Sequence, residues 1–227
     1  MQTQDAPAEF LFKLWPWLEA NKNRLIGVIA AVIVASGVYY FISSQREQKE
    51  IDAGRALTQL LVMPPSGANP GQVADSLAQF AVKFSGTAAA QRAQLQAAAA
   101  LFGGGRYADA QVQFQKFLDT TSGGPLAAEA QLGVGASLEA QNKLDLAAAA
   151  YQKVASGFSG TPSALPALCA LGRIAEQQGK LAEAENSYEA AARVGQAGGT
   201  LAHDADIRAA EIKAKLAAQK PATPVSK

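Results

Sequence analysis

The residues that could carry out catalysis are few and lie far apart in this chain. The sequence has one histidine, His203, and one cysteine, Cys169. Covalent and acid–base catalysis need a nucleophile and a base within hydrogen-bond reach of each other. His203 falls at the expected start of a C-terminal helix, and Cys169 falls in an Ala/Leu-rich helical segment where a small packed thiol is the ordinary interpretation. The sequence therefore predicts no catalytic residue, and one cysteine permits no internal disulfide.

Two further patterns could bind phosphate or metal, but each lacks what such a site needs. The Gly-rich segment 102–106 is not followed by Lys-Ser or Lys-Thr, and no strand pattern precedes it. Acidic pairs such as Glu183 with Glu185, or Asp204 with Asp206, are typical of solvated helix faces. We therefore expect no enzyme activity, no cofactor and no metal ion.

Charge and composition narrow the class of protein further. The chain has 20 Lys and Arg against 19 Asp and Glu, a formal net charge of +1. A chain with almost no net charge does not attract a phosphate backbone, so nucleic acid is not an expected partner. Aromatic residues make up only 7% of the chain and alanine is abundant, which favours close-packed helices over sheets.

An uncharged apolar stretch, Leu25–Ile42, is the strongest single feature of the sequence. As a helix it would be about 27 Å long, close to the ~30 Å hydrocarbon core of a bilayer. Aromatic residues at 39–41 and the cations Lys22 and Arg24 are typical of the two membrane interfaces. We interpret the stretch as a transmembrane helix in a lipid bilayer. A cleaved signal peptide and a buried core helix are the alternatives.

The flanks of this stretch predict an interfacial segment before it and a continuing helix after it. Trp15 and Trp17, separated by Pro16, favour a segment that lies on the membrane, and a disordered tail is the alternative. Helical spacing continues without a breaker as far as Leu61, before the turn signal at 63–67. Basic residues flank both ends of the span at comparable distances, so loop charge does not choose an orientation.

The rest of the chain repeats itself at a fixed interval. Phe84-Ser85-Gly86-Thr87 recurs as Phe158-Ser159-Gly160-Thr161, two intervals of 37 residues later. Such a period indicates stacked helical units that bury their apolar faces against one another. Three units are predicted, each with two helices. The first helices span Ala88–Phe102, Ala127–Ala140 and Leu165–Gln178, the second begin at Tyr107, Leu144 and Leu181, and a glycine or asparagine ends each first helix.

These units carry a pattern that resembles the second half of the tetratricopeptide motif. The matching segments are Gly105-x-Tyr107-x-x-Ala110-x-x-x-Phe114, Asn142-x-Leu144-x-x-Ala147-x-x-x-Tyr151 and Gly179-x-Leu181-x-x-Ala184-x-x-x-Tyr188, with the small residues Ala98, Gly135 and Gly172 in the first helices. The chain departs from the family at Gln94, Gln131 and Leu168, where an aromatic residue is expected, and in its period of 37 against roughly 34. The resemblance implies an all-α solenoid that binds protein partners.

The whole layout also resembles the bacterial single-span proteins with a periplasmic tetratricopeptide domain, typified by the ancillary subunit of the Sec translocon. This resemblance implies an inner-membrane protein with its N-terminus inside and its repeats in the periplasm. Its partners would be translocon subunits or exported proteins. The alternative hypothesis is a self-associating organiser of an envelope complex for cell division or wall synthesis, in which case the chain would form homo-oligomers.

The family's geometry places a set of side chains from the first helices on the concave binding surface. In this sequence they are Arg92, Leu95, Phe102, Glu129, Leu132, Glu139, Cys169, Arg173 and Glu176, with Ala99, Ala136 and Pro166 between them. The Lys/Asn set with which some family members bind a terminal carboxylate is absent. We therefore expect an apolar peptide or helix as the bound segment.

The predicted organisation has six parts. They are an N-terminal tail and interfacial segment at 1–24, a transmembrane helix at 25–42, a continuing helix with a degenerate first repeat at 43–87, three repeats at 88–199, a capping helix at 200–220 and a disordered tail at 221–227.

Overall fold

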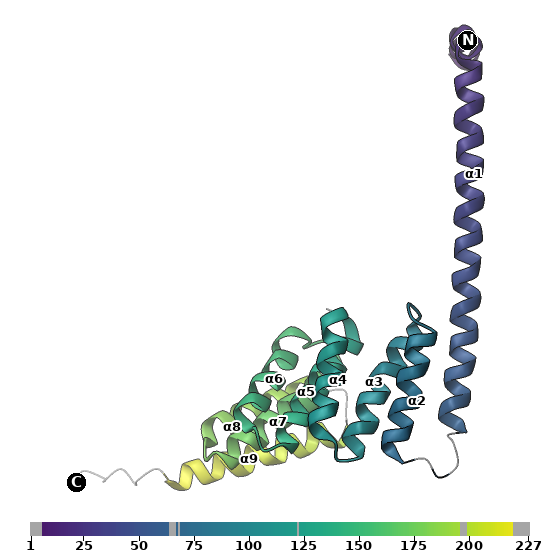
Figure 1. Ribbon diagram of the computed structural model, residues 1–227. Coiled ribbons are helices and arrows are strands. Elements are labelled where there is room, and N and C mark those ends of the chain that lie inside the picture. The colour runs from purple at the N-terminus through teal and green to yellow at the C-terminus, as the bar shows by residue number, and fades with distance from the viewer. Residues whose placement is uncertain (1–5, 64–66, 68, 122, 196–198, 220–227) are drawn as a thin grey trace. The chain divides into compact units, whose positions relative to one another are not determined.

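The computed structural model describes residues 6–63, 67, 69–121, 123–195 and 199–219 (Figure 1). These residues form nine α-helices and no strand, which confirms the all-α fold. The helices are α1 (Ala6–Val62), α2 (Pro70–Lys83), α3 (Ala88–Gly103), α4 (Tyr107–Thr120), α5 (Gly124–Ala140), α6 (Leu144–Gly157), α7 (Ala164–Gln177), α8 (Leu181–Val194) and α9 (Thr200–Gln219). The chain divides into two units, Met1–Asp52 and Ala53–Lys227. Residues 64–66 of the turn predicted at 63–67, and the tail predicted at 221–227, lie outside the described residues.

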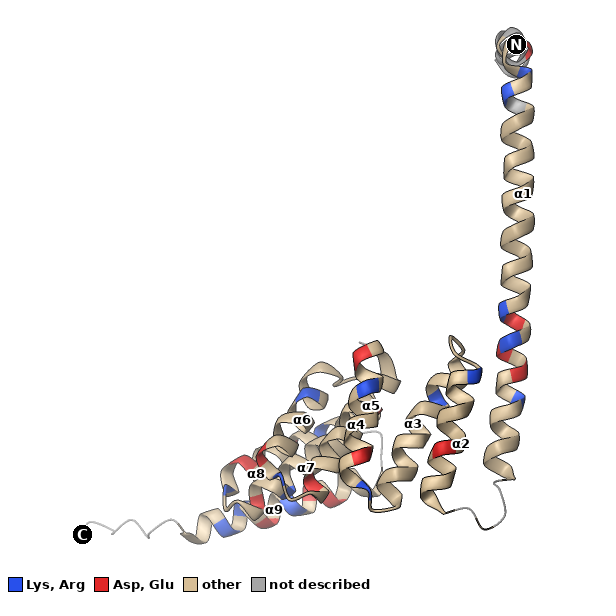
Figure 2. Cartoon of the chain, in the orientation of Figure 1, with Lys and Arg blue, Asp and Glu red and all other residues tan. Residues whose placement is uncertain are grey.

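The first unit consists of α1 up to Asp52. The helix begins at Ala6 and continues through Pro16, without a break before the apolar stretch. No charged residue lies on it between Arg24 and Arg46 (Figure 2). Within the described part of the chain, α1 is the one helix long and apolar enough to cross a membrane, with a mean hydropathy of 2.4 over its most apolar 18 residues.

The second unit is a row of helical hairpins in chain order. Each helix from α3 to α8 packs mainly against the helix before it and the helix after it, and α2 packs mainly against α3. We call the first helix of each full hairpin helix A (α3, α5, α7) and the second helix B (α4, α6, α8). Ala53 and Leu57 at the end of α1 are buried with this unit, and α9 covers α8. The predicted hairpins and capping helix are therefore present.

Each full hairpin turns in the same way between helix A and helix B. Gly105, Asn142 and Gly179 have φ values of 75°, 58° and 71°, in the left-handed region that glycine and asparagine tolerate. The next residue in each hairpin, Arg106, Lys143 or Lys180, then donates its backbone N–H to a helix A carbonyl at 2.9 Å. These turns confirm the prediction that a glycine or asparagine ends each first helix.

The recurring Phe-Ser-Gly-Thr segments form one kind of loop. The hydroxyl of Thr87 donates to the carbonyl oxygen of Phe84 at 2.7 Å, and that of Thr161 donates to Phe158 at the same distance. Thr87 also accepts the backbone N–H of Ala90 at 3.1 Å, which caps the start of α3. The repeated threonine thus closes the loop that leads into the next hairpin.

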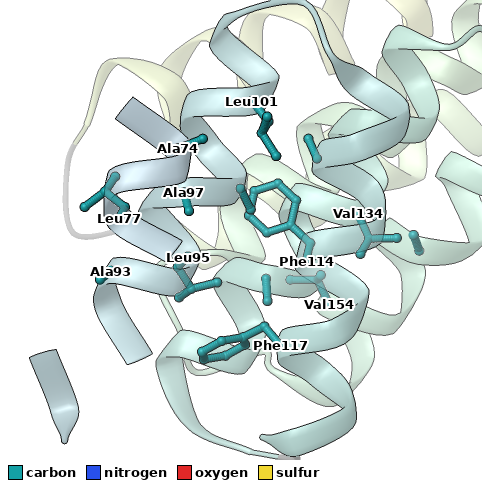
Figure 3. Close-up of a cluster of buried hydrophobic side chains, with 14 of the residues drawn as sticks. Ala74, Leu77, Ala93, Leu95, Ala97, Leu101, Phe114, Phe117, Val134 and Val154 are labelled. Carbon is teal, nitrogen blue, oxygen red and sulfur yellow. The ribbon is translucent and has the colours of Figure 1, made fainter. Parts of the chain in front are cut away.

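Two clusters of buried side chains hold the second unit together. The larger extends from the end of α1 to α7 and includes Phe117, a large side chain that is 0% exposed (Figure 3). The smaller joins α8 to α9 through Tyr188 and Ile212, among other residues. Because each cluster spans several elements, no hairpin buries its apolar face alone.

Candidate partner-binding surface

The residues predicted to bind a partner all lie on helix A of the three full hairpins. Arg92 and Glu129 are exposed, while Phe102 and Leu132 are partly buried and pack against the larger core cluster. Cys169 is partly buried and packs against the smaller cluster. The surface therefore combines free charges with side chains that also support the fold.

Leu95 differs from the other predicted members because it lies in the core. It is 3% exposed and sits among the core side chains of the larger cluster (Figure 3). The neighbouring Gln94, where the family has an aromatic residue, is only partly buried. Leu95 has almost no surface with which to contact a partner.

Glu139 and Arg173 are brought together from two different hairpins. The Arg173 guanidinium donates to both carboxylate oxygens of Glu139, at 2.7 and 2.8 Å from Nη2 and 3.0 Å from Nε. The Tyr151 hydroxyl donates to the same carboxylate at 2.8 Å. Glu139 is 19% exposed and Arg173 is 51% exposed, so the pair lies at the surface but is not fully solvated. This cluster connects helix A of one hairpin with helix A of the next.

The same carboxylate–hydroxyl contact recurs one repeat later. Tyr188 donates its hydroxyl to Glu176 at 3.1 Å, and both residues lie 37 positions after Tyr151 and Glu139. Among the described residues no arginine or lysine forms an ion pair with Glu176. The second copy of the contact therefore leaves its carboxylate without a cation.

The first hairpin has an apolar version of this arrangement. The position 37 residues before Glu139 is Phe102, whose ring meets the edge of Tyr107 with centroids 5.1 Å apart. The predicted surface is therefore apolar at the C-terminal end of α3, where Phe102 lies, and charged at the corresponding end of α5 and on α7, where Glu139 and Arg173 lie.

Close helix packing sets the position of both tyrosine hydroxyls. A Cβ atom on Gly135 would lie 2.6 Å from a carbon of the Tyr151 ring, and one on Gly172 would lie 2.8 Å from the Tyr188 ring. Each ring therefore lies directly over a glycine of its own helix A. That contact points the hydroxyl toward the carboxylate one turn further along the same helix A.

These surroundings change the proton affinities of the cluster. Burial, together with the hydrogen bond to Glu139, raises the pKa of Tyr151 well above its ordinary value of 10.0. The same two causes, with Glu176 as the acceptor, raise the pKa of Tyr188 to about 12. Burial is the largest single effect and acts to lower the pKa of Arg173, but the hydrogen bond to Glu139 and the attraction of its charge, with smaller contributions from Tyr151 and Tyr188, together outweigh burial, so the pKa is raised and the guanidinium stays charged. Burial also raises the pKa of the Cys169 thiol, which therefore stays protonated near neutral pH.

We expect the repeats to lose stability in alkali because of these two tyrosines. Their folded pKa values lie above the unfolded value of about 10, so their contribution is complete below pH ~10 and falls as the pH rises toward 12. Each can lower the free energy of unfolding by up to about 1.4 kcal/mol per pH unit in that range. Urea unfolding of the wild type and of the double variant Tyr151→Phe, Tyr188→Phe from pH 8 to 11.5 measures the difference. The advantage of the wild type should shrink above pH ~10; a constant difference would contradict the assignment.

The tyrosine hydroxyls were not predicted from the sequence to be part of this surface. Tyr151 and Tyr188 were named only as aromatic positions of the repeated pattern. The signal was present, because a glutamate lies 12 residues before each of these tyrosines, at Glu139 and Glu176. The contact between Arg173 and Glu139 joins two repeats, so no spacing within one repeat predicts it.

Helices that pack mainly on their chain neighbours, with the same turn at a 37-residue interval, define the class of helical-repeat solenoids. A family model described as a tetratricopeptide repeat-like domain matches residues 13–218, and the chain belongs to this family. Domains of this type are in general non-catalytic scaffolds that bind proteins. The match covers the apolar stretch of α1 as well as the repeats. No curated protein and no solved structure matches the chain.

Proposed function

We propose that this protein is a membrane-anchored scaffold: α1 crosses the bilayer, and the repeats bind partner proteins at the membrane surface. The observation that carries the proposal is that one unbroken helix contains the apolar stretch and ends inside the repeat unit. α1 runs from Ala6 to Val62, and Ala53 and Leu57 near its end are buried with the repeats. The same polypeptide segment would therefore serve as anchor and as the first helix of the scaffold.

The exposure of the apolar stretch supports the anchor. None of its most apolar 18-residue window is buried, and Ile26, Ile33 and Phe41 are all more than half exposed. Soluble proteins rarely expose a continuous apolar surface of this length to water. A bilayer removes that cost, and a helix satisfies its own backbone hydrogen bonds there.

The resemblance to single-span periplasmic proteins supplies the proposed location. In this proposal the chain lies in the inner membrane of a bacterium with its repeats in the periplasm, near the Sec translocon or where exported proteins are handled. A family match that includes both the apolar stretch and the repeats is in keeping with that arrangement. The alternative is a self-associating organiser of an envelope complex.

The helix A residues suggest what kind of partner binds. Because Arg173 and Glu139 neutralise each other, the surface offers no strong net charge there. Of the other charges, Glu176 accepts a hydrogen bond from Tyr188, and the exposed charges Arg92 and Glu129 are opposite in sign. An apolar peptide or helix, oriented by these two charges, fits the surface better than a strongly charged partner.

The first test of this function is the anchor. The full chain should stay in the membrane pellet during alkaline extraction, and the intact mass of that form should include the residues before Leu25. The double variant Ile33→Arg, Val34→Asp should move to the supernatant, because each charge at the centre of a span costs about 2.5–3.5 kcal/mol. The matched control places the same two charges just beyond the span, as Ser43→Arg, Ser44→Asp, and should stay in the pellet. Release of the wild type would contradict the proposal.

The second arm of the test identifies what the repeats bind. A photoreactive amino acid at Ala99, on the predicted surface of α3, should crosslink to a different polypeptide in the membrane fraction. The same group at Val112, which is exposed on helix B, serves as the matched control. Crosslinks between two copies of this chain would favour the self-associating organiser instead. Phe102 and Leu132 are unsuitable positions because both also pack against the core.

A further inference from the structure

A groove of about 570 Å³ lies between the end of α1 and α2, within the second unit. Its apolar lining comes from Ala56, Leu60, Met63, Phe80 and Phe84. Met63 is 73% exposed, so the apolar surface of the groove is open to solvent. None of the residues predicted to bind a partner lines this groove.

The two helices that form the groove lack a contact that the later hairpins have. In the hairpin of α5 and α6, the ring of Tyr151 lies directly over Gly135. Two intervals of 37 residues earlier, Leu77 stands at the position of Tyr151 and Leu61 stands at the position of Gly135. Leu61 is 45% exposed, whereas Leu77 is buried. Neither residue can form the ring-over-glycine contact of the later hairpins, and α1 and α2 are not among the helix pairs in close contact.

The edge of the groove carries one type of charge. Lys83 is the charged residue among those that line it, and the other polar lining residues are Gln59, Ser76 and Gln79. The Lys83 ammonium lies 5.3 Å from the centre of the Phe84 ring. Among the described residues it has no carboxylate partner. An exposed cation beside an apolar groove therefore has its charge available for a ligand.

We propose that this groove binds an acidic amphipathic segment of a partner polypeptide, whose apolar side chains enter the groove and whose carboxylate pairs with Lys83. The volume falls in the range of about 300–1,000 Å³ typical of binding pockets. A groove between two helices suits the apolar face of a third helix or an extended peptide. The unpaired cation selects an acidic segment over a basic one. The site would be a second docking position, separate from the helix A surface.

The test uses two synthetic amphipathic peptides with the same Leu/Ala face. One carries glutamates at the edge of that face and the other carries lysines. Binding to the full chain in lipid nanodiscs, which avoids detergent in the groove, is measured by fluorescence anisotropy. The acidic peptide should bind saturably and the basic peptide about tenfold more weakly. Lys83→Glu should reverse this preference, whereas Lys153→Glu, the same charge change on an exposed residue of α6, should leave it unchanged.

A second variant tests the apolar part of the groove. Met63→Asp should weaken binding of both peptides, and the high exposure of Met63 means that the fold should persist, as circular dichroism would check. Three outcomes would overturn the proposal. They are equal binding of both peptides by the wild type and by Lys83→Glu, a wild-type dimer that Lys83→Glu abolishes, and displacement of the acidic peptide by a short-chain anionic phospholipid. None of these measurements depends on the helix A surface, so they can fail while the proposed scaffold function stands.

Discussion

Replacing Phe117 with alanine is expected to lower the free energy of unfolding of the repeats by about 3–5 kcal/mol. The side chain is 0% exposed and is the largest fully buried one in the described part of the chain. It lies in the same core cluster as Leu95 and Val154, which come from α3 and α6 (Figure 3). Truncation removes buried apolar surface and leaves a cavity among α3, α4 and α6. These helices cannot all move inward to fill it.

Thermal unfolding followed by circular dichroism measures this loss, with Val112→Ala as the matched control. Val112 is on the same helix, α4, but is 62% exposed. Its change to alanine removes a β-branched side chain from a helix surface, which should be neutral or slightly stabilising. Equal losses of stability for the two variants would mean that the burial of Phe117 does not stabilise the fold.

The hairpins could be predicted from the sequence because their signals are local and recur. Helix B begins at Tyr107, Leu144 and Leu181 in the structure, as the pattern predicts, because the turn before each start depends on a few adjacent residues. A left-handed residue such as Asn142 or Gly179 fixes that turn without help from the rest of the fold. Because the pattern recurs at a fixed interval, three hairpins support the same prediction.

The contacts of the candidate surface could not be predicted in the same way. Tyr151 reaches Glu139 only because the ring lies over Gly135, which is a matter of helix separation and rotation. Arg173 reaches the same carboxylate from the next hairpin, so its partner depends on how two repeats stack. Leu95 shows the converse, because the family's spacing assigns it to the surface but it lies in the core. Family spacing assigns positions to a face, but side-chain contacts across helices decide which positions remain exposed.

The cluster at Glu139 also connects stability with binding. The ring of Tyr151 packs in the core, and its hydroxyl donates to Glu139 at the surface. Glu139 is therefore held in position, and it in turn holds the Arg173 guanidinium. A bidentate arginine–carboxylate pair fixes geometry as well as adding energy. The charged half of the candidate surface is therefore held in place by the packing beneath it, which reduces the entropy that a partner's binding would cost.

Replacing Gly135 with alanine is expected to destabilise the repeats by about 1–3 kcal/mol, although alanine favours helices by ~1 kcal/mol over glycine. The added Cβ would lie 2.6 Å from a carbon of the Tyr151 ring, closer than non-bonded atoms tolerate. The ring cannot move away freely, because Tyr151 is buried and its hydroxyl is bonded to Glu139 at 2.8 Å. Steric overlap should therefore outweigh the gain in helix propensity.

Gly54→Ala is the matched control, because it makes the same chemical change where nothing lies within 4 Å of the new atom. That variant should be stabilised by up to ~1 kcal/mol, so the two substitutions should shift the melting temperature in opposite directions. A second readout follows from the displaced ring. If Tyr151 must leave Glu139 to accommodate the methyl group, removing its hydroxyl should cost less in the Gly135→Ala background than in the wild type, as a double-mutant cycle would show. Additive effects, or a gain in stability from Gly135→Ala, would mean that the ring does not rest on this glycine.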